Sequence, residues 1–364
     1  MTTIQDQGQT GAALLGRLQR WAHDQLIPLN ASIELTQRCN IRCQHCYNFD
    51  RDLPRHGGGA AVGCAEPPEL ATDELLRVVS ELHQAGCMFL SLTGGEALMH
   101  PAFFTVMDHA GSLNMAVQVL SNGLLLRPGI VGRLARYRNL TRVSVSLYGA
   151  TAEVHDAITQ VPGSFARTWA GAELLRQRGI AVLLKFLLMR GNAHQAQQMM
   201  DDAQTRGFIY RVDTTVTARH DGTNGTLGLR LEREQLNTLF RGPLRPLVRK
   251  GKERTFTDAE FACNCARGMC AITATGDVQP CISVPLSAGN IRRQSFAEIW
   301  RDSPLFQWIR GLRVQDYPSC APCPHKSWCT HERGAAVTYG GSYTGTDPLV
   351  CARAEIAHAL ADEG

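Results

Sequence analysis

Long apolar runs are what this 364-residue sequence most clearly lacks. No stretch approaches the roughly 18 apolar residues that a membrane-spanning helix needs, and residues 1–10 are polar, without the apolar core of a secretion signal. The formal net charge is only +4, and no basic stripe interleaved with aromatic residues is present. We therefore expect a cytoplasmic protein that binds neither a membrane nor nucleic acid.

Cysteine, in contrast, is abundant: the sequence contains 13. In a reducing compartment such a number favours metal ligands over disulfides. Cys64 and Cys87 stand alone, and Cys87 fits a small apolar residue at the start of a strand. The other cysteines fall into three groups: Cys39, Cys43 and Cys46; Cys263, Cys265, Cys270 and Cys281; and Cys320, Cys323, Cys329 and Cys351.

The first group has the spacing CxxxCxxC and follows a short alternating run, residues 32–36. Three thiolates on one loop can hold three irons of a cubane [4Fe–4S] cluster, so that the fourth iron stays open to a small molecule. A zinc site is the alternative, although zinc usually takes four ligands in close pairs.

Strand and helix patterns alternate along residues 31–240. The predicted strands are 32–36, 87–93, 115–121, 141–147, 180–189 and 209–217. Helices are predicted over 11–25, 72–85, 101–113, 128–137, 151–158, 164–178 and 193–206, and residues 55–68 are predicted to form a loop. Such alternation predicts a parallel sheet with right-handed crossovers, and chemistry at the carboxyl ends of its strands.

The cysteine loop after a first strand, with the aromatic Tyr47 directly behind it, resembles the radical S-adenosylmethionine (radical SAM) superfamily. The resemblance implies an α/β fold, a partial (β/α)6 TIM-like barrel. It also implies that the open iron chelates SAM, that one electron cleaves SAM to a 5′-deoxyadenosyl radical, and that Tyr47 belongs to the cofactor site.

Two motifs at the ends of strands strengthen this resemblance. Gly94, Gly95 and Glu96 resemble the GGE motif that holds the SAM amino group, although Ala97 stands where the family usually has proline. Ser121 and Asn122 resemble the SNG turn near the SAM methionine or ribose. Plain β-turns are the alternative for both motifs.

Ser144 and Ser146 lie on one face of strand 141–147, and the turn after it resembles the SLxG turn whose serine reaches the SAM ribose. A polar pair inside the barrel is the alternative. Asp213, near the end of strand 209–217, is the candidate catalytic base, although a helix cap or an ion pair is the commoner use of such a carboxylate.

The turn Gly276–Cys281 and the later CxxCx5C spacing resemble the SPASM domain of peptide-modifying radical SAM enzymes, which implies two auxiliary [4Fe–4S] clusters. The set Cys320, Cys323, Cys329 and Cys351 is complete. The other cluster lacks its usual last cysteine, because Arg333 stands there and a guanidinium cannot ligate iron. We expect Cys263, Cys265, Cys270 and Cys281 to close it. Ligation by His331, or one open iron, is the alternative.

The predicted organisation is an N-terminal tail and helix (1–30), the barrel (31–240), a linker (241–262) and the SPASM domain (263–364). The resemblance implies a peptide-modifying oxidoreductase that modifies or crosslinks side chains of a ribosomally made precursor peptide, a RiPP maturase. A reduced flavodoxin or ferredoxin would supply the first electron. Because residues 1–30 are too short for a peptide-binding domain, we expect a separate leader-binding protein, or an exposed surface of this chain, to capture the peptide leader.

Other enzymes share this architecture. They include the anaerobic sulfatase-maturing enzyme, the maturase of pyrroloquinoline quinone (PQQ) and haem-pathway enzymes. Arg333 breaks the complete cysteine set that the sulfatase maturase uses. A non-catalytic iron–sulfur scaffold for electron transfer is the alternative from another class, and the intact SAM motifs argue against it.

Overall fold

The computed structural model describes residues 4–48, 68–248 and 257–363, with side chains from residue 13 onward. The predicted loop 55–68 lies outside these ranges apart from its last residue. Within them, no helix is both long and apolar enough to cross a membrane.

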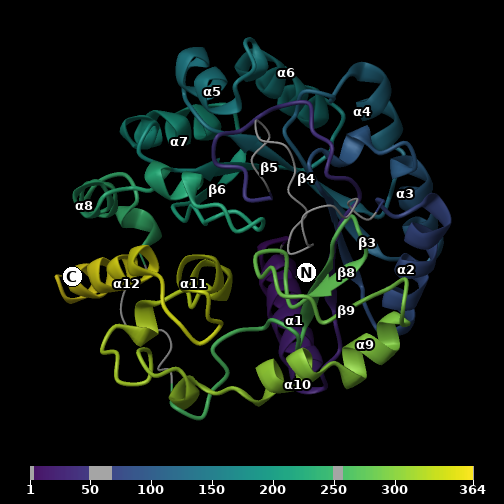
Figure 1. Ribbon diagram of the computed structural model, residues 1–364. Helices are drawn as coiled ribbons and strands as arrows, with labels where there is room; N and C mark the ends of the chain where they lie inside the picture. The colour runs from purple at the N-terminus through teal and green to yellow at the C-terminus, as the bar shows by residue number, and fades with distance from the viewer. Residues whose placement is uncertain (1–3, 49–67, 249–256, 364) are drawn as a thin grey trace.

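Six parallel strands form the centre of the molecule, in the spatial order β6-β5-β4-β3-β2-β1 (Figure 1). The prediction of a partial (β/α)6 barrel is confirmed. The strands are β1 (Asn30–Glu34), β2 (Phe89–Thr93), β3 (Ala116–Ser121), β4 (Leu140–Leu147), β5 (Val182–Leu187) and β6 (Ile209–Asp213).

Helices cover the outer face of this curved sheet (Figure 1). Alternation decides which side chains meet them: Val143, Val145 and Leu147 of β4 are buried against the helices, whereas Arg142 points to the open inner face. The outer helices are α2 (Thr72–Gln84), α3 (Phe103–Ser112), α4 (Pro128–Leu134), α5 (Ala152–Thr159), α6 (Ser164–Gln177) and α7 (Ala196–Thr205); α8 (Arg233–Arg241) follows them.

The sheet does not end at β1. Strand β7 (Met269–Ile272) pairs with β1 in parallel, and β8 (Asp277–Gln279) and β9 (Gly289–Asn290) continue antiparallel. Gly276 makes the β7–β8 turn with φ +91°, a conformation that favours glycine. Main-chain hydrogen bonds therefore join the C-terminal cysteine region directly to the barrel.

The remaining C-terminal helices lie in two places: the first pair lies below β8 and β9, and the last pair lies toward α8 (Figure 1). They are α9 (Phe296–Asp302), α10 (Pro304–Gly311), α11 (Arg333–Gly340) and α12 (Pro348–Asp362). A buried ion pair, Arg230 Nη2 to Asp347 Oδ2 at 2.7 Å, fixes the start of α12. Short 3-10 turns are η1 (Ala97–Met99), η2 (Ala193–Gln195), η3 (Gly225–Leu229), η4 (Arg245–Leu247), η5 (Val314–Asp316) and η6 (Lys326–Trp328).

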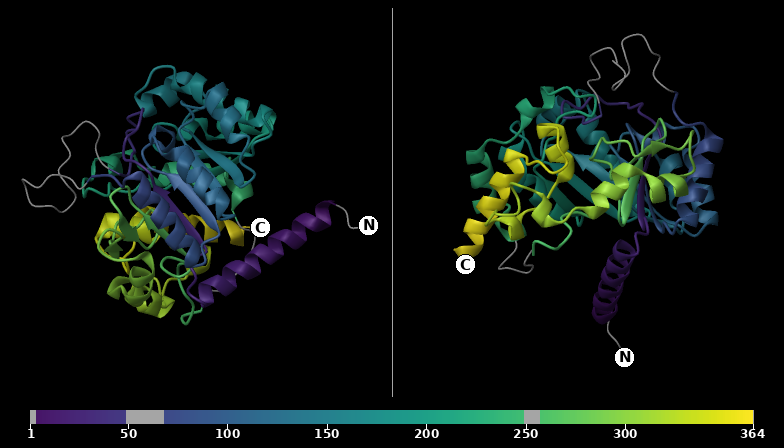
Figure 2. Two further views of the ribbon diagram at one scale, coloured as in Figure 1. Left: turned by 90° about the vertical axis from the view of Figure 1, so that its right-hand side faces the viewer. Right: turned by 60° about the horizontal axis from the view of Figure 1, so that its bottom comes forward.

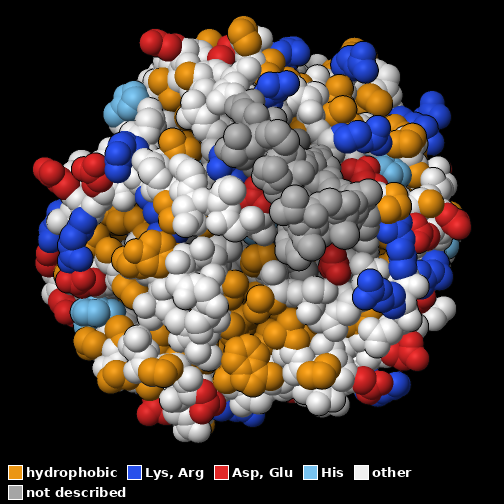
Figure 3. Space-filling model, in the orientation of Figure 1, with side chains coloured by type: hydrophobic (Ala, Val, Ile, Leu, Met, Phe, Trp, Pro, Cys, Tyr) orange, Lys and Arg blue, Asp and Glu red, His pale blue; other side chains and the backbone are white. Residues whose placement is uncertain are grey.

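Helix α1 (Ile4–Asp24) begins seven residues before the predicted start at residue 11 and projects away from the body of the molecule (Figure 2). Leu14 and Trp21 are exposed, and from residue 13 onward only Ala22 of this helix is buried. On the face seen in Figure 3, lysine and arginine side chains are spread around the rim and form no single stripe.

Candidate active site

The first three cysteines lie on the loop that leaves β1. Main-chain bonds tie this loop to the end of α5, from Arg42 N to Thr159 O (3.0 Å) and from Gln44 N to Ile158 O (3.1 Å). Burial raises the pKa of the Tyr148 phenol well above its ordinary range, and the thiols of Cys43, Cys46 and Cys39 add to this rise. The three predicted ligands are therefore gathered around one tyrosine at the carboxyl end of β4.

The glycine pair after β2 packs against the same loop. Gly95 N donates to Thr36 O (2.7 Å), and Glu96 N donates to Arg38 O (2.8 Å). A Cβ on Gly95 would lie 2.3 Å from Arg38 O, and Gly94 has φ +142°. The absence of a side chain at these glycines allows the chain's own cysteine loop to pack closely against them.

Glu96 joins two of the predicted motifs. Its buried carboxylate accepts hydrogen bonds from Asn122 N (2.8 Å) and the Ser121 hydroxyl (3.1 Å). Burial raises the pKa of Glu96 to about 7. The Asn122 amide in turn lies 3.7 Å from Cys39 Sγ, so the GGE and SNG segments and the cysteine loop form one connected site.

Ser144 and Ser146 lie on β4, on the face opposite the helix-packed valines. Ser144 is buried, and Ser146 is hydrogen-bonded to the side chain of Tyr148, beside the first cysteines. Both serines thus lie on the inner face that leads to the cysteine loop. Their predicted contact with the SAM ribose stays a prediction.

Glu34, at the end of β1, is a buried acid that our sequence analysis did not single out. The Tyr47 hydroxyl lies 3.5 Å from Glu34 Oε1, and the Tyr47 ring packs 4.9 Å from the ring of His220. Burial raises the pKa of Glu34 to about 7. The sequence did contain a signal for this acid: Glu34 is a single carboxylate at the end of an apolar strand, shortly before the CxxxCxxC motif.

We predict a pH-dependent stability that originates at Glu34. Because its folded-state pKa lies above the ordinary value of 4.5, it favours folding below pH 4.5, and this contribution is lost as the pH rises through 7. Glu34→Gln should therefore match the wild-type free energy of unfolding near pH 5 and exceed it at pH 8, by at most about 3 kcal/mol. Urea unfolding of the metal-free protein at both pH values measures this. A wild type that gains stability relative to the variant between them would contradict it.

Asp213, the candidate base, is exposed at the end of β6. Its carboxylate accepts from Thr215 N (2.9 Å), which is a turn contact. On the same inner face, Lys185 of β5 is in register with Ser146 of β4 and with Arg211 of β6. Asp213 thus lies among cations near the strand ends, and its catalytic role stays a prediction.

The structure brings together the complete last set of cysteines. Burial raises the pKa of Cys329 to about 11, and Cys320 and Cys351 add to the rise. Cys320 and Cys323 also raise the pKa of Cys351 at the start of α12, after burial. Cys320 and Cys351 are therefore near Cys329, and Cys323 is near Cys351.

Three cysteines of the middle set also meet, and we call Cys263, Cys265 and Cys281 the thiol trio. The sulfurs of Cys263 and Cys265 are 3.1 Å apart, and the neighbouring Cys265 thiol lowers the pKa of Cys281. The hydrogen bond from Cys265 lowers the pKa of Cys263 to about 7.

Cys270, the fourth predicted member, does not join the trio. It lies within β7, in register with Ala31 of β1. It is fully buried, and its pKa is raised by burial and by Cys87 at the start of the β2 segment. Since neighbouring residues of a strand point to opposite faces, Cys270 packs in the core between the sheet and its helices.

Arg333 is buried and held by main-chain carbonyls. Its guanidinium donates to the oxygens of His331 (3.1 Å), Tyr343 (3.3 Å) and Gly345 (3.2 Å), and lies 4.8 Å from the Tyr317 ring. No carboxylate of the described residues pairs with it. Its charge lowers the pKa of Cys263 and of Cys329, so it acts on both C-terminal cysteine sets.

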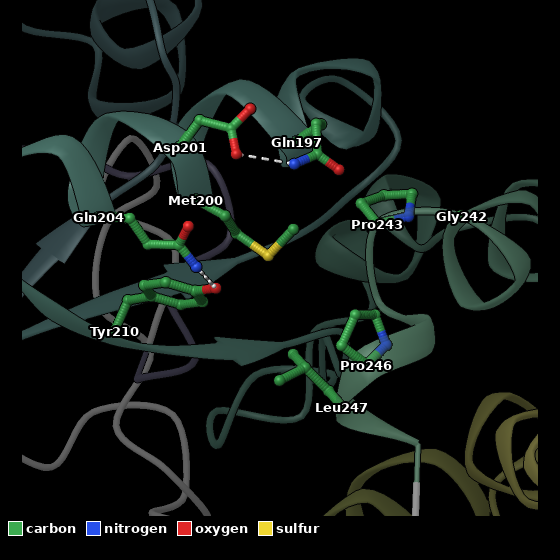
Figure 4. A pocket seen from close by; sticks show the side chains of 9 residues that line it. All are labelled: Gln197, Met200, Asp201, Gln204, Tyr210, Gly242, Pro243, Pro246 and Leu247. Carbon is green, nitrogen blue, oxygen red and sulfur yellow. Dashed lines mark hydrogen bonds between the residues drawn. The ribbon is translucent and has the colours of Figure 1, made fainter.

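One surface cavity of about 170 Å³ lies apart from these groups, between α7, β6 and residues 242–247 (Figure 4). Its lining includes Tyr210, whose hydroxyl accepts from Gln204 Nε2 at 3.0 Å, and Pro246. None of the predicted site residues borders it.

The donors in these places suit iron–sulfur clusters. Thiols are the ligands that cubane clusters take, and the described cysteines form no disulfides. Among the residues that the structure describes, no three such donors already lie close enough together to hold a single metal ion. Only the first group of cysteines lies at the carboxyl ends of the barrel strands, beside the buried acceptor Glu96. The arrangement thus defines an α/β-barrel iron–sulfur protein with one site for a small polar ligand.

Comparison with known proteins agrees with this class. The family model of the radical SAM superfamily matches residues 33–203, and a model described as an iron-sulfur cluster-binding domain, SPASM, matches residues 263–324. The AdoMet-dependent heme synthase of Methanosarcina barkeri is 30% identical over 340 residues, which are 86% of this chain and 94% of that protein. The chain belongs to the radical SAM/SPASM family and is a radical SAM enzyme.

Other similar proteins include a maturase and a protein solved with a precursor peptide. Mycofactocin maturase MftC of Mycobacterium ulcerans is 28% identical over 368 residues, 95% of this chain and 94% of that protein. The crystal structure of Streptococcus suis SuiB bound to precursor peptide SuiA has a TM-score of 0.64 at 16% identity, covering 92% of this chain and 79% of SuiB. At that identity the second match supports the fold alone.

Proposed function

We propose that this enzyme oxidatively modifies or crosslinks side chains of a ribosomally made precursor peptide. The observation that carries the proposal is the free edge of β6. No strand of the described residues pairs with its outer side, and the strand is largely accessible, with Ile209 62% exposed. An extended peptide can add to such an edge through main-chain hydrogen bonds. The similarity to MftC supports the same substrate class.

In this proposal Cys39, Cys43 and Cys46 hold three irons of a [4Fe–4S] cluster. Together with bound SAM, that cluster supplies a 5′-deoxyadenosyl radical. The Glu96 carboxylate accepts a hydrogen bond from the SAM ammonium, whose charge favours the ionised form of an acid with a pKa near 7. Tyr47 and Asn122 border the same space, and Ser144 and Ser146 line the path from the barrel.

Removal of a second electron and a proton completes a net two-electron oxidation. The thiol trio and the quartet of Cys320, Cys323, Cys329 and Cys351 are the proposed ligands of two auxiliary clusters that accept the electron. Asp213 is the proposed proton acceptor, since its carboxylate is accessible at the end of β6. A reduced flavodoxin or ferredoxin supplies the initiating electron, and a separate leader-binding protein is the proposed carrier of the peptide.

The test combines the reconstituted, reduced enzyme with the small peptide encoded beside its gene. We expect 5′-deoxyadenosine to form together with peptide that has lost two hydrogens per modification, as read by mass spectrometry. Asp213→Asn should lower peptide oxidation more than SAM cleavage, because it removes only the proton acceptor. The control is Asp221→Asn, a carboxylate that also accepts in a local turn, from Thr223 N. Unchanged peptide beside vigorous SAM cleavage would count against this substrate.

A haem-pathway reaction is the second candidate. Its support is the 30% identity to the heme synthase and the accessible cations Lys185 and Arg211, which face the inside of the barrel and suit substrate carboxylates. Incubation with a carboxylated tetrapyrrole in place of peptide separates the two candidates. Conversion of the tetrapyrrole, with no conversion of peptide, would favour this second function.

A further inference from the structure

The hydroxyl of Tyr343 is an enclosed polar group in the part of the fold that contains the thiol trio. This residue is 3% exposed, and its hydroxyl oxygen is fully buried without a hydrogen-bond partner among the described residues. A buried hydroxyl left without a partner costs about 1–3 kcal/mol. Such groups in a native fold usually mark a water, ion or ligand that completes the site.

The surroundings of Tyr343 connect this hydroxyl with the trio. After burial, the strongest influences that raise the pKa of its phenol are Cys265 and Cys263, followed by Tyr317 and Cys281. Every member of the trio is therefore near the phenol. The quartet is not among these influences.

The position of the Tyr343 main chain depends on Arg333. The guanidinium donates to Tyr343 O and Gly345 O and so holds the loop between α11 and α12. The ring of Tyr343 packs edge-on against Trp308 at 5.8 Å. In addition, Gly334 lies directly against Ser283, two residues from Cys281, where a Cβ would be 2.2 Å from Ser283 O. Arg333, which stands where the family usually has a cysteine, thus anchors the main chain of Tyr343.

We propose that Tyr343 supplies the fourth ligand of the first auxiliary cluster, with its phenolate oxygen bound to the iron that the thiol trio leaves open. Forming the Fe–O bond releases the phenol proton to solvent and changes no oxidation state. Phenolate is an established iron ligand, as tyrosine shows in haem proteins. The inference rests on the cluster assignment made under the proposed function and goes beyond it, since it closes a site that three cysteines leave incomplete.

The test uses the reconstituted full-length protein and Tyr343→Phe, which keeps the ring and removes only the oxygen. Resonance Raman spectra of the wild type should show ring modes of an iron-bound phenolate, and the variant should lose them. After mild oxidation with SAM present, the variant should also release one more iron than the wild type and gain one [3Fe–4S] signal in electron paramagnetic resonance. Tyr317→Phe is the matched control, because Tyr317 is a buried tyrosine beside Cys263 and Cys265, and it should retain the wild-type spectra.

The possible outcomes distinguish a failure of the proposed Tyr343 ligand from a failure of the auxiliary-cluster assignment. Phenolate modes that disappear only in Tyr343→Phe would support the ligand. A wild type that holds auxiliary iron without phenolate modes, with Tyr343→Phe identical in iron content and spectra, would overturn it and leave the auxiliary cluster standing. A wild type with iron only in the SAM-binding site would instead overturn the auxiliary cluster, and the ligand with it.

Discussion

Replacing Cys43 with alanine should abolish the formation of 5′-deoxyadenosine in the reconstituted, reduced protein. The three predicted thiolates would hold the SAM-binding cluster at three irons, so the loss of one would leave it with two of its predicted protein ligands. Among the thiols that raise the pKa of Tyr148, Cys43 contributes most, which places it near this tyrosine. Chromatography of the reaction products measures the effect, and iron content should fall from about twelve to about eight per chain.

The matched control for this experiment is Cys87→Ala. Cys87 is 1% exposed, and its thiol donates weakly to Phe89 O at 3.5 Å, which is a packing role. This variant should keep its iron and cleave SAM at the wild-type rate. If Cys43→Ala also cleaved SAM like the wild type, the assignment of the first cluster would be wrong.

Gly95→Ala should reduce SAM cleavage at least about tenfold, equivalent to ~1.4 kcal/mol in the activation barrier. The added Cβ would meet Arg38 O at 2.3 Å and Gln37 O at 2.6 Å, both main-chain atoms of the segment that leads into Cys39. Since neither atom belongs to a flexible side chain, the cysteine loop itself must move. Steady-state formation of 5′-deoxyadenosine and equilibrium binding of SAM both report this.

Gly191→Ala is the control for the glycine experiment. Gly191 follows β5, and a Cβ there would meet nothing within 4 Å. Wild-type SAM binding and cleavage are expected for this variant. Wild-type activity of Gly95→Ala would show that the cysteine loop tolerates displacement, contrary to the packing described above.

Local patterns predicted the barrel well because each strand has its own alternation. In the run 141–147, Val143, Val145 and Leu147 are buried against helices. The strand β4 (Leu140–Leu147) therefore forms within one residue of the predicted range. The start of α1 was missed, since residues 4–10 are polar and no apolar stripe marks them. The pairing of β7 with β1 was also missed, because pairing between residues about 240 positions apart leaves no local signal.

The middle cysteine set shows the same limit in the candidate site. Four cysteines within residues 263–281 suggested one ligand group, since closeness in sequence was the available measure. The fold separates Cys270 from the others by placing it in a strand whose partner is β1. Tyr343 carried no signal in the sequence, because it lies in a loop 62 residues beyond Cys281 and reaches the trio only through the contacts of Arg333.

The sequence by itself determined the cysteine loop after the first strand, the motifs at the strand ends and the order of strands and helices. Each of these depends on neighbouring residues, whose spacing and periodicity are local properties. Tertiary structure alone decided that Glu34 and Glu96 are enclosed with raised pKa values, and that the sheet continues into the cysteine region. It also decided which thiols meet. Burial, strand pairing and electrostatic range depend on distances between remote segments, and those distances exist only once the chain has folded.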